Sequence, residues 1–388
     1  MRDLSKVKID DVCCKSISKI NSKFSNVINY IDISSIDNEI KEIISYQEID
    51  ISNAPSRAKQ ILKVGDILVS MVRPNLNAVA MVKDNGRTYV ASTGYSVLRC
   101  TNKINNVYLF YFCQSKSFIN TLTVQATGAS YPAVSNKIIR NCLVNLPSLS
   151  EQQQIADTLD KVSDLIAKRK QQLEKLDLLV KSRFVEMFGD PIVNDKNWNI
   201  SKLSEYLNVI GGYAFKSSDF KEKGIPVLRI GNINSGYFTA TNMVFWENES
   251  NLERYKMFPG DLVMSLTGTV GKDDYGNVCI LGDEYNEYYL NQRNAKLEIL
   301  GNIDKLYLSE LLKVPRIKKQ LTGISRGVRQ ANISNKDILN LSVPIPPIKL
   351  QNKFADFVTA IEQQKEKIKK GLETLETLKA SLMQKYFG

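Results

Sequence analysis

Residues 147–189 read PSLSEQQQIADTLDKVSDLIAKRKQQLEKLDLLVKSRFVEMFG, a polar stretch that follows asparagine and leucine and ends at a glycine. Its apolar residues are spaced by four and three positions in turn, which is the 3.5-residue period of a coiled-coil seam. We expect one long helix here, with Ser150 as its N-cap and Gly189 at its end. The expected seam consists of Ile155, Leu159, Val162, Ile166, Leu173, Leu176 and Val180, with Met187 beyond them and Arg169 and Arg183 in its two breaks.

The stretch is part of a repeat, because Gly128–Gly189 aligns without a gap on Gly327–Gly388 at a constant shift of 199. Farther upstream, Gly65-Asp66 returns as Gly260-Asp261 at a shift of 195. Two similar halves carry two similar surfaces, related by an approximate two-fold axis. The expected second seam consists of Phe354, Val358, Ile361, Ile368, Leu372, Leu375 and Leu382, with Tyr386 beyond them and Lys365 and Lys379 in its breaks.

The sequence before each long helix mixes strand and helix patterns. Strands are predicted at 66–72, 78–82, 225–230 and 261–266, and helices at 107–113 and 303–312. We therefore expect an α+β fold with a pseudo-two-fold internal repeat, in which two mixed domains (1–146 and 191–345) are joined by two long helices (147–190 and 346–388). The seam period favours an antiparallel coiled coil over the alternative that each helix packs on its own domain.

Charge points to a polyanionic partner. The 388 residues contain 52 Lys and Arg against 41 Asp and Glu, a formal net charge of +11. Residues 85–150 and 311–336 contain no acidic residue, and these two stretches overlap when the halves are aligned. Each half therefore carries its own basic face, and a face without acids favours contact with phosphates.

Several catalytic and metal-binding classes are excluded by composition. The chain has no histidine, which rules out Ser-His-Asp and Cys-His centres and any zinc site with a histidine ligand. Its six cysteines include no C-x-x-C pair, so we expect free thiols in a reducing, cytoplasmic setting, and no segment is apolar enough to span a membrane. Gly268-Thr269-Val270-Gly271-Lys272 is too short for a phosphate-binding loop and lacks the Ser or Thr after the lysine.

Two basic domains held apart by a stiff helical pair suit a duplex with two recognised blocks. An antiparallel pair would place the domains at its opposite ends and act as a ruler along the DNA. Because the two halves differ in sequence, we expect the two blocks to differ, so that the target is bipartite, asymmetric and has a fixed, unread gap.

The whole chain resembles the specificity subunits of type I restriction–modification systems. The passages typical of that family are 54–58 (APSRA), 64–68 (VGDIL), 147–156 (PSLSEQQQIA), 187–191 (MFGDP) and 224–233 (GIPVLRIGNI). One departure is 350–353 (LQNK), which replaces the commoner Glu-Gln-Gln opening of the second helix and bears on its cap or on a methylase contact.

The resemblance implies a non-catalytic subunit with two target-recognition domains and two spacer helices. Its implied partners are double-stranded DNA, two modification subunits that methylate adenine, and restriction subunits that translocate and cut DNA. No cofactor is expected in this chain, whereas S-adenosylmethionine, ATP and Mg are expected in the partner subunits.

Candidate DNA contacts lie on loops within the basic faces, where Arg and Lys read guanine and Asn and Gln read adenine. In the first half they are Arg73, Asn75, Asn77, Ser130, Tyr131 and Lys137. In the second half they are Arg229, Asn232, Asn234, Thr267, Lys272, Gln292, Arg293, Arg326, Arg329 and Gln330. Lys313, Arg316, Lys318 and Lys319 have the spacing of one helix face and are predicted to contact phosphates.

Two other functions remain open at this point. One is a non-catalytic coiled-coil scaffold that binds acidic protein partners, for which duplex binding would be weak and independent of sequence. The other is a self-sufficient nuclease or methylase with an unfamiliar centre, which would act on DNA without partners.

Overall fold

The structure is a computed structural model that describes residues 5–21, 27–323 and 330–388. The chain divides into two compact units, Met1–Gln171 with Lys369–Gly388 and Gln172–Ile368. Each long helix contributes one part to each unit, and the two units are described separately below.

Within its described residues, the first unit contains one sheet of four strands, one of three strands, two pairs of short strands, and four short helices before the long helix. A four-stranded sheet has the order β5-β2-β9-β6, and a three-stranded sheet has the order β10-β7-β8. The strands are β1 (Lys6–Lys8), β2 (Val27–Ile31), β3 (Ile36–Asp37), β4 (Glu42–Ile43), β5 (Gln47–Asp50), β6 (Ala58–Ile61), β7 (Ile67–Ser70), β8 (Val79–Met81), β9 (Tyr89–Ser92), β10 (Tyr95–Leu98) and β11 (Leu143–Asn145). The helices are α1 (Ile9–Val12), α2 (Asn106–Phe112), α3 (Lys116–Gln125), α4 (Asn136–Asn141) and the long α5 (Leu149–Phe188).

The second unit repeats this plan with sheets of order β15-β14-β20-β16 and β13-β21-β17-β19. Its strands are β12 (Asn199–Lys202), β13 (Leu207–Gly211), β14 (Ile225–Leu228), β15 (Val244–Trp246), β16 (Lys256–Met257), β17 (Leu262–Ser265), β18 (Thr267–Thr269), β19 (Val278–Ile280), β20 (Tyr288–Leu290), β21 (Asn294–Ile299), β22 (Gln330–Asn332) and β23 (Ser342–Ile345). Its helices are α6 (Lys305–Lys313), α7 (Pro315–Thr322), α8 (Asn335–Leu339) and the long α9 (Ile348–Phe387).

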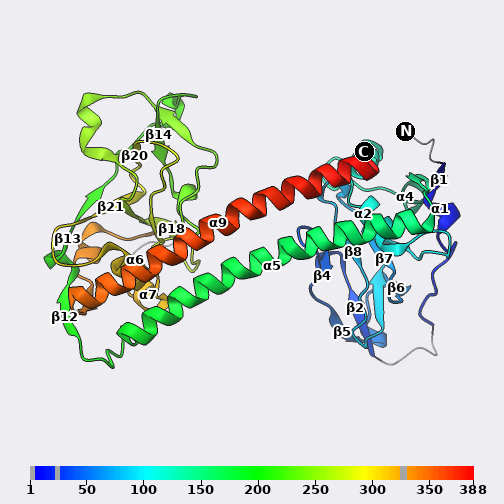
Figure 1. The fold of residues 1–388 in the computed structure, drawn as a ribbon, viewed down its shortest axis with the longest axis horizontal. Helices are drawn as coiled ribbons and strands as arrows, with labels where there is room; N and C mark the ends of the chain where they lie inside the picture. Colours follow the sequence, from blue (N-terminus) through cyan, green and yellow to red (C-terminus); the bar gives the residue numbers. More distant parts are fainter. Residues whose placement is uncertain (1–4, 22–26, 324–329) are drawn as a thin grey trace. The chain divides into compact units, whose positions relative to one another are not determined.

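The predicted α+β fold with an internal repeat is confirmed. In each unit one four-stranded sheet has parallel central strands, β2 with β9 and β14 with β20, whereas the other strand pairs are antiparallel. The strands and short helices predicted from the sequence correspond to β7, β8, β14, β17, α2 and α6, with no end misplaced by more than two residues. Figure 1 shows α5 and α9 as uninterrupted helices.

The start of α5 differs from the prediction, because Ser148 caps it rather than Ser150. The Ser148 hydroxyl accepts the Glu151 N–H at 3.3 Å, while Glu151 Oε2 accepts the Ser148 N–H at 3.1 Å. This reciprocal pair is a capping box. Pro347 stands at the matching place before α9, so the second helix begins without that box. The helix α5 ends at Gly189, whose φ of +77° is left-handed.

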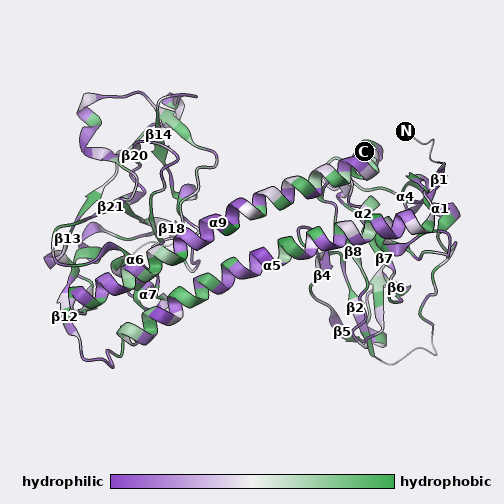
Figure 2. Ribbon diagram, viewed as in Figure 1, coloured by the Kyte–Doolittle hydropathy of each residue, from purple (hydrophilic) through white to green (hydrophobic). Residues whose placement is uncertain are grey.

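The two helices are antiparallel within each unit. In the first unit Lys170 Nζ lies 3.4 Å from the Glu376 carboxylate, and in the second Lys365 Nζ lies 2.7 Å from Asp177. Within the second unit the ring of Phe188 also lies 5.3 Å from that of Phe354, so numbers rise along α5 as they fall along α9. Within the first unit Leu159 and Phe387 share one hydrophobic core, which gives the same direction. Every predicted seam residue is buried or half-buried, whereas Leu178 on the outer face is 59% exposed. Polar and apolar residues alternate along both helices in Figure 2.

The helices pack on the globular part of each unit as well as on each other. In the first unit the ring of Phe387 lies 5.1 Å from that of Tyr108, at the end of α9. In the second unit the ring of Phe188 lies 4.7 Å from that of Tyr307, at the end of α5. Such buried aromatic pairs add stability beyond their apolar area. The main hydrophobic core of each unit therefore includes residues of both long helices.

A buried glutamine ties each helix start to its unit in the same way. Gln152 Nε2 donates to the Pro147 carbonyl at 2.9 Å, and its Oε1 accepts the Asn105 N–H at 2.8 Å. Gln351 repeats both bonds with Pro346 and the Asp304 N–H, at 2.7 and 2.8 Å. The unusual stretch 350–353 thus keeps the buried glutamine, Gln351. It alters the cap, because Leu350 stands where α5 has the capping residue Glu151.

Replacing Gly371 by Ala should raise the free energy of unfolding by about 0.5–1 kcal/mol. Gly371 lies in the middle of α9, where a Cβ would meet no atom within 4 Å. The equivalent residue of α5 is Gln172, so the helix accepts a side chain at this place. Chemical denaturation of both proteins measures the difference.

Gly65→Ala is the matched control and should lower stability. Gly65 has a φ of +84°, and its Cβ would lie 2.7 Å from Asn106 Nδ2. If Gly371→Ala were less stable than the parent protein, the interpretation that α9 does not require a glycine at this position would be wrong.

Candidate nucleic-acid interface

A tight turn between β7 and β8 presents the predicted readers of the first unit. This first turn, Arg73–Asn77, contains one short 3-10 segment (Pro74–Leu76) and has a left-handed φ of 49° at both Arg73 and Asn77. The Arg73 N–H donates to the Pro132 carbonyl at 2.7 Å, which fixes the start of the turn. Arg73 and Asn75 are exposed, whereas Pro74 and Asn77 are buried.

A second loop of the first unit lies against this turn. Val72 and Ala133 form a β-bridge, and the Arg73 guanidinium lies 4.7 Å from the centre of the Tyr131 ring. The ring is 68% exposed, and the neighbouring Ser130 is also exposed. The structure thus brings Arg73, Ser130 and Tyr131 together as a cationic and aromatic surface, a combination suited to nucleic acid. Lys137 is exposed in the first turn of α4, outside these contacts.

Asn77 supports the first turn instead of facing solvent. Its Nδ2 donates to the Cys113 carbonyl at 2.8 Å, and its Oδ1 accepts from Lys41 Nζ at 2.9 Å. Burial, with added repulsion from Lys379, lowers the pKa of Lys41 to about 8. Both polar atoms of the Asn77 side chain are therefore engaged within the fold, and we leave Asn77 out of the base contacts proposed below.

The second unit has a longer loop at the equivalent place, Thr267–Gly276. Its first strand, β18, pairs with β22, which sets Thr267 opposite Asn332 and Thr269 opposite the backbone of Gln330. Asp274 accepts the Thr269 N–H at 2.8 Å and closes the loop, with the exposed Lys272 near its tip. Arg326 and Arg329, two predicted readers, lie outside the described residues.

The turn between β20 and β21 adds Gln292 and Arg293 to this surface. Both side chains are exposed, and the Arg293 carbonyl accepts the Leu266 N–H at 2.8 Å, directly before Thr267. The structure therefore brings together Thr267, Lys272, Gln292 and Arg293, which come from two separate parts of the sequence.

Three predicted readers belong to a supporting turn after β14. Asn232 is 3% exposed; its Oδ1 accepts the Arg229 N–H, and its Nδ2 donates to the Thr239 and Thr241 carbonyls. Arg229 donates to the Asn242 carbonyl, and the Asn234 carbonyl accepts from Asn277 Nδ2 at 2.8 Å. Asn232 therefore shapes this turn, and we leave it out of the proposed base contacts.

The prediction that four basic residues share one helix face is wrong. Val314 is extended because a proline disfavours helical geometry in the residue before it, so α6 ends at Lys313 and α7 begins at Pro315. Lys313, Arg316 and Lys319 are exposed, but Lys318 is only 8% exposed and points inward. Only the three exposed residues can reach a phosphate on this surface.

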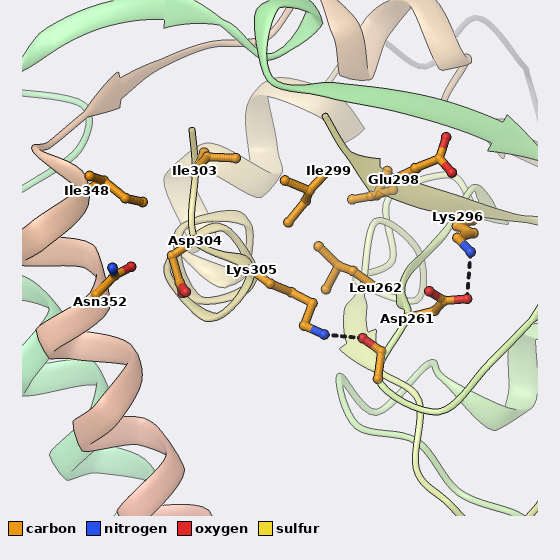
Figure 3. Close-up of a pocket in the computed structure, with 12 residues that line it drawn as sticks. Asp261, Leu262, Lys296, Glu298, Ile299, Ile303, Asp304, Lys305, Ile348 and Asn352 are labelled. Carbon is orange, nitrogen blue, oxygen red and sulfur yellow. Dashed lines mark hydrogen bonds and ion pairs between the residues drawn. The ribbon is translucent and has the colours of Figure 1, made fainter. Parts of the chain in front are cut away.

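One cavity of the second unit is lined by none of the predicted DNA contacts. This cavity of about 450 Å³ lies between α9, α6 and the edge of β17 and β21. Figure 3 shows Lys296 and Lys305 on its wall directed at Asp261 and at the Gly260 carbonyl, so both ammonium groups are hydrogen-bonded within the protein. Within the described residues, no cluster of three or more His, Cys, Asp or Glu could hold a metal ion. No helix in that part of the chain is long and apolar enough to cross a membrane.

The sequence did not predict the groups that support these surfaces. Lys41 and Asn277 were missed, since each acts on residues made adjacent only by the fold. Lys41 and Asn77 are 36 positions apart, and no motif between them signals the contact.

Comparisons with known proteins agree on one family. Residues 1–176 and 195–377 match the family model described as type I restriction modification DNA specificity domain. The MjaVIII specificity subunit of Methanocaldococcus jannaschii is 29% identical over 348 residues, covering 83% of this chain and 78% of that protein. The EcoKI specificity subunit of Escherichia coli is 24% identical over 327 residues, covering 79% of this chain and 69% of that protein.

Solved structures show the same fold. A chain from a structural study of complex assembly and conformational transition in the type I R-M system has a TM-score of 0.61 and 23% identity, covering 100% of this chain and 98% of that one. The S subunit of a type I restriction–modification system from M. genitalium has a TM-score of 0.59 and 15% identity, covering 100% and 97%.

Replacing Arg73 by Ala should weaken binding to duplex DNA at the preferred sequence by about 10-fold and should relax preference at one position. The side chain is exposed and held over Tyr131, so its loss leaves the fold intact. Binding of the assembled protein to target duplexes with single base changes measures the effect.

Lys319→Ala is the contrasting variant. Loss of an exposed phosphate contact should weaken binding to all sequences alike and reduce the salt dependence. If the Arg73→Ala protein kept the base preference of the parent at every position, Arg73 would not contact a base.

Proposed function

This chain belongs to the family of type I restriction–modification specificity subunits, and we propose that it recognises a bipartite, asymmetric DNA sequence with a fixed gap. On this proposal each unit reads one block through the loops described above. The first turn with Tyr131 serves one block, and the loop Thr267–Gly276 with Arg293 serves the other.

The observation that carries the proposal is the presence of equivalent surfaces with different side chains. Both surfaces follow the same strand, β7 or β17, and both lie beside a loop that precedes a serine-capped helix, α4 or α8. Arg73 and Tyr131 dominate one, whereas Thr267 and Lys272 occupy the other. Equivalent frames with unlike contacts should read unlike sequences.

The long helices would set the gap. Each has 40 residues, which at about 1.5 Å per residue corresponds to a spacer of roughly 60 Å. Their paired seam resists bending, so the length of DNA between the blocks would be fixed by the protein.

The proposed partners are two modification subunits and the restriction subunits. The chain would select the DNA site. The partners would carry out methyl transfer with S-adenosylmethionine, and ATP- and Mg-dependent translocation and cleavage. A scaffold for acidic proteins is not favoured, because the family match extends over both halves of the chain.

Exchanging residues 191–345 for the matching domain of a relative with another target tests modular reading. β12 and β23 pair with each other, so these limits keep both strands of the pair in the exchanged piece. We expect one block of the methylated sequence to change completely and the other to stay the same, as measured by methylome sequencing with the modification subunits present. A change in both blocks would contradict modular reading.

Lengthening both helices by one heptad tests the spacer. Seven residues inserted after Gln171 and seven after Ile368 preserve the seam and add about 10 Å, which should widen the gap by roughly 3 base pairs. Four-residue insertions at the same places are the control, because they rotate the seam out of register and should reduce methylation. An unchanged gap in the heptad variant would rule out the spacer role.

A further inference from the structure

We propose that two desolvated lysines, Lys318 in the second unit and Lys41 in the first, act as positioning residues that hold the reading loops in the shape that selects bases. The inference rests on the proposed function. Neither lysine would touch DNA; each would act through the loop that it holds.

Lys318 fastens the loop Thr267–Gly276 to helix α7. Its ammonium is paired with the Asp273 carboxylate and donates to Asn277 Oδ1 at 2.7 Å. The Tyr275 hydroxyl adds a second tie to the same helix, donating to the Thr322 carbonyl at 2.7 Å. The exposed Lys272 lies next to Asp273, so the position of this proposed reader depends on the clamp.

Asn277 extends the clamp to the supporting turn after β14. It accepts from Lys318 through Oδ1 and donates through Nδ2 to the Asn234 carbonyl at 2.8 Å. Its own N–H donates to Ser265 Oγ at 3.0 Å, at the end of β17. One buried ammonium thus connects a helix, a reading loop and a second turn.

Lys41 holds the first turn in place, but from a hairpin instead of a helix. It lies in the β3–β4 hairpin with a left-handed φ of 60°, and its Nζ donates to the Asn77 carbonyl at 2.6 Å and to Asn77 Oδ1 at 2.9 Å. Asn38 of the same hairpin donates to the Leu76 carbonyl at 3.3 Å. Asn77 is tied in turn to the Cys113 carbonyl at the end of α2.

A role in packing alone does not account for this arrangement. Burying an ammonium costs free energy that an apolar side chain of similar length would not cost. In each unit one acceptor belongs to the reading loop itself, Asn77 in the first and Asp273 in the second. The two lysines are not equivalent in the repeat, since the residue of α3 that matches Lys318 is Ile119. The same contact is thus made from two different elements.

The test compares Lys318→Met and Lys41→Met in cells that carry the complete system, with methylome sequencing as the measurement. We expect Lys318→Met to lose about 10-fold of the preference for the correct base within the second block only. Lys41→Met should do the same within the first block only. A purely structural role would instead reduce methylation at all sites without changing either block.

Matched controls are Lys223→Met and Lys59→Met, which remove exposed lysines from the same units, away from the proposed DNA contacts. Both should keep the two blocks of the parent protein. Lys318→Arg retains a charged donor and should restore most of the preference in the second block.

Asp273→Ala keeps the inference testable if Lys318→Met does not accumulate. The Asp273 side chain is 87% exposed, so its removal spares the core and should broaden the second block in the same direction. Unchanged blocks in Lys318→Met and Lys41→Met, or in Asp273→Ala where Lys318→Met is lost, would overturn the inference. A parent protein that directs methylation to no defined bipartite sequence would instead overturn the proposed function, and the clamps with it.

Discussion

The structure depends on the burial of one aromatic ring at the far end of each long helix. Phe188 packs on Tyr307, and Phe387 packs on Tyr108, so each globular part receives the end of one helix and the start of the other. The tyrosine hydroxyls then donate to carbonyls at the base of the unit, Tyr108 to Asn145 and Tyr307 to Pro344. These repeated contacts combine apolar burial with a satisfied polar group, which fixes each helix end in a single place.

The repeat was predictable because the two halves of the chain are similar in sequence and align at a constant shift. The aligned stretches 128–189 and 327–388 contain the seam, whose pattern depends on local spacing alone. The strands β7 and β17 were also predictable, because each is a short buried run after a glycine turn. The capping residue of α5 was misjudged since Ser148 and Ser150 both precede the seam.

The candidate interface was only partly predictable, for a physical reason. Exposed candidate readers such as Arg73 and Lys272 follow strands and can be proposed from residue type and position. Whether an asparagine faces solvent or supports a turn depends on partners far away in sequence, as the contact of Lys41 with Asn77 shows. Helical spacing likewise suggested one face for the basic residues at 313–319, but Pro315 divides them between two helices.

The division of the chain also bears on how it is made. The second unit is one contiguous segment, Gln172–Ile368, whereas the first unit needs residues from both ends of the chain. During synthesis from the N-terminus, the second unit has all its residues while the first still lacks the end of α9 with Phe387. Tyr108 and Phe112 therefore lack their contact with the Phe387 ring until the whole second unit has been synthesised. Until then the first unit keeps an apolar surface uncovered.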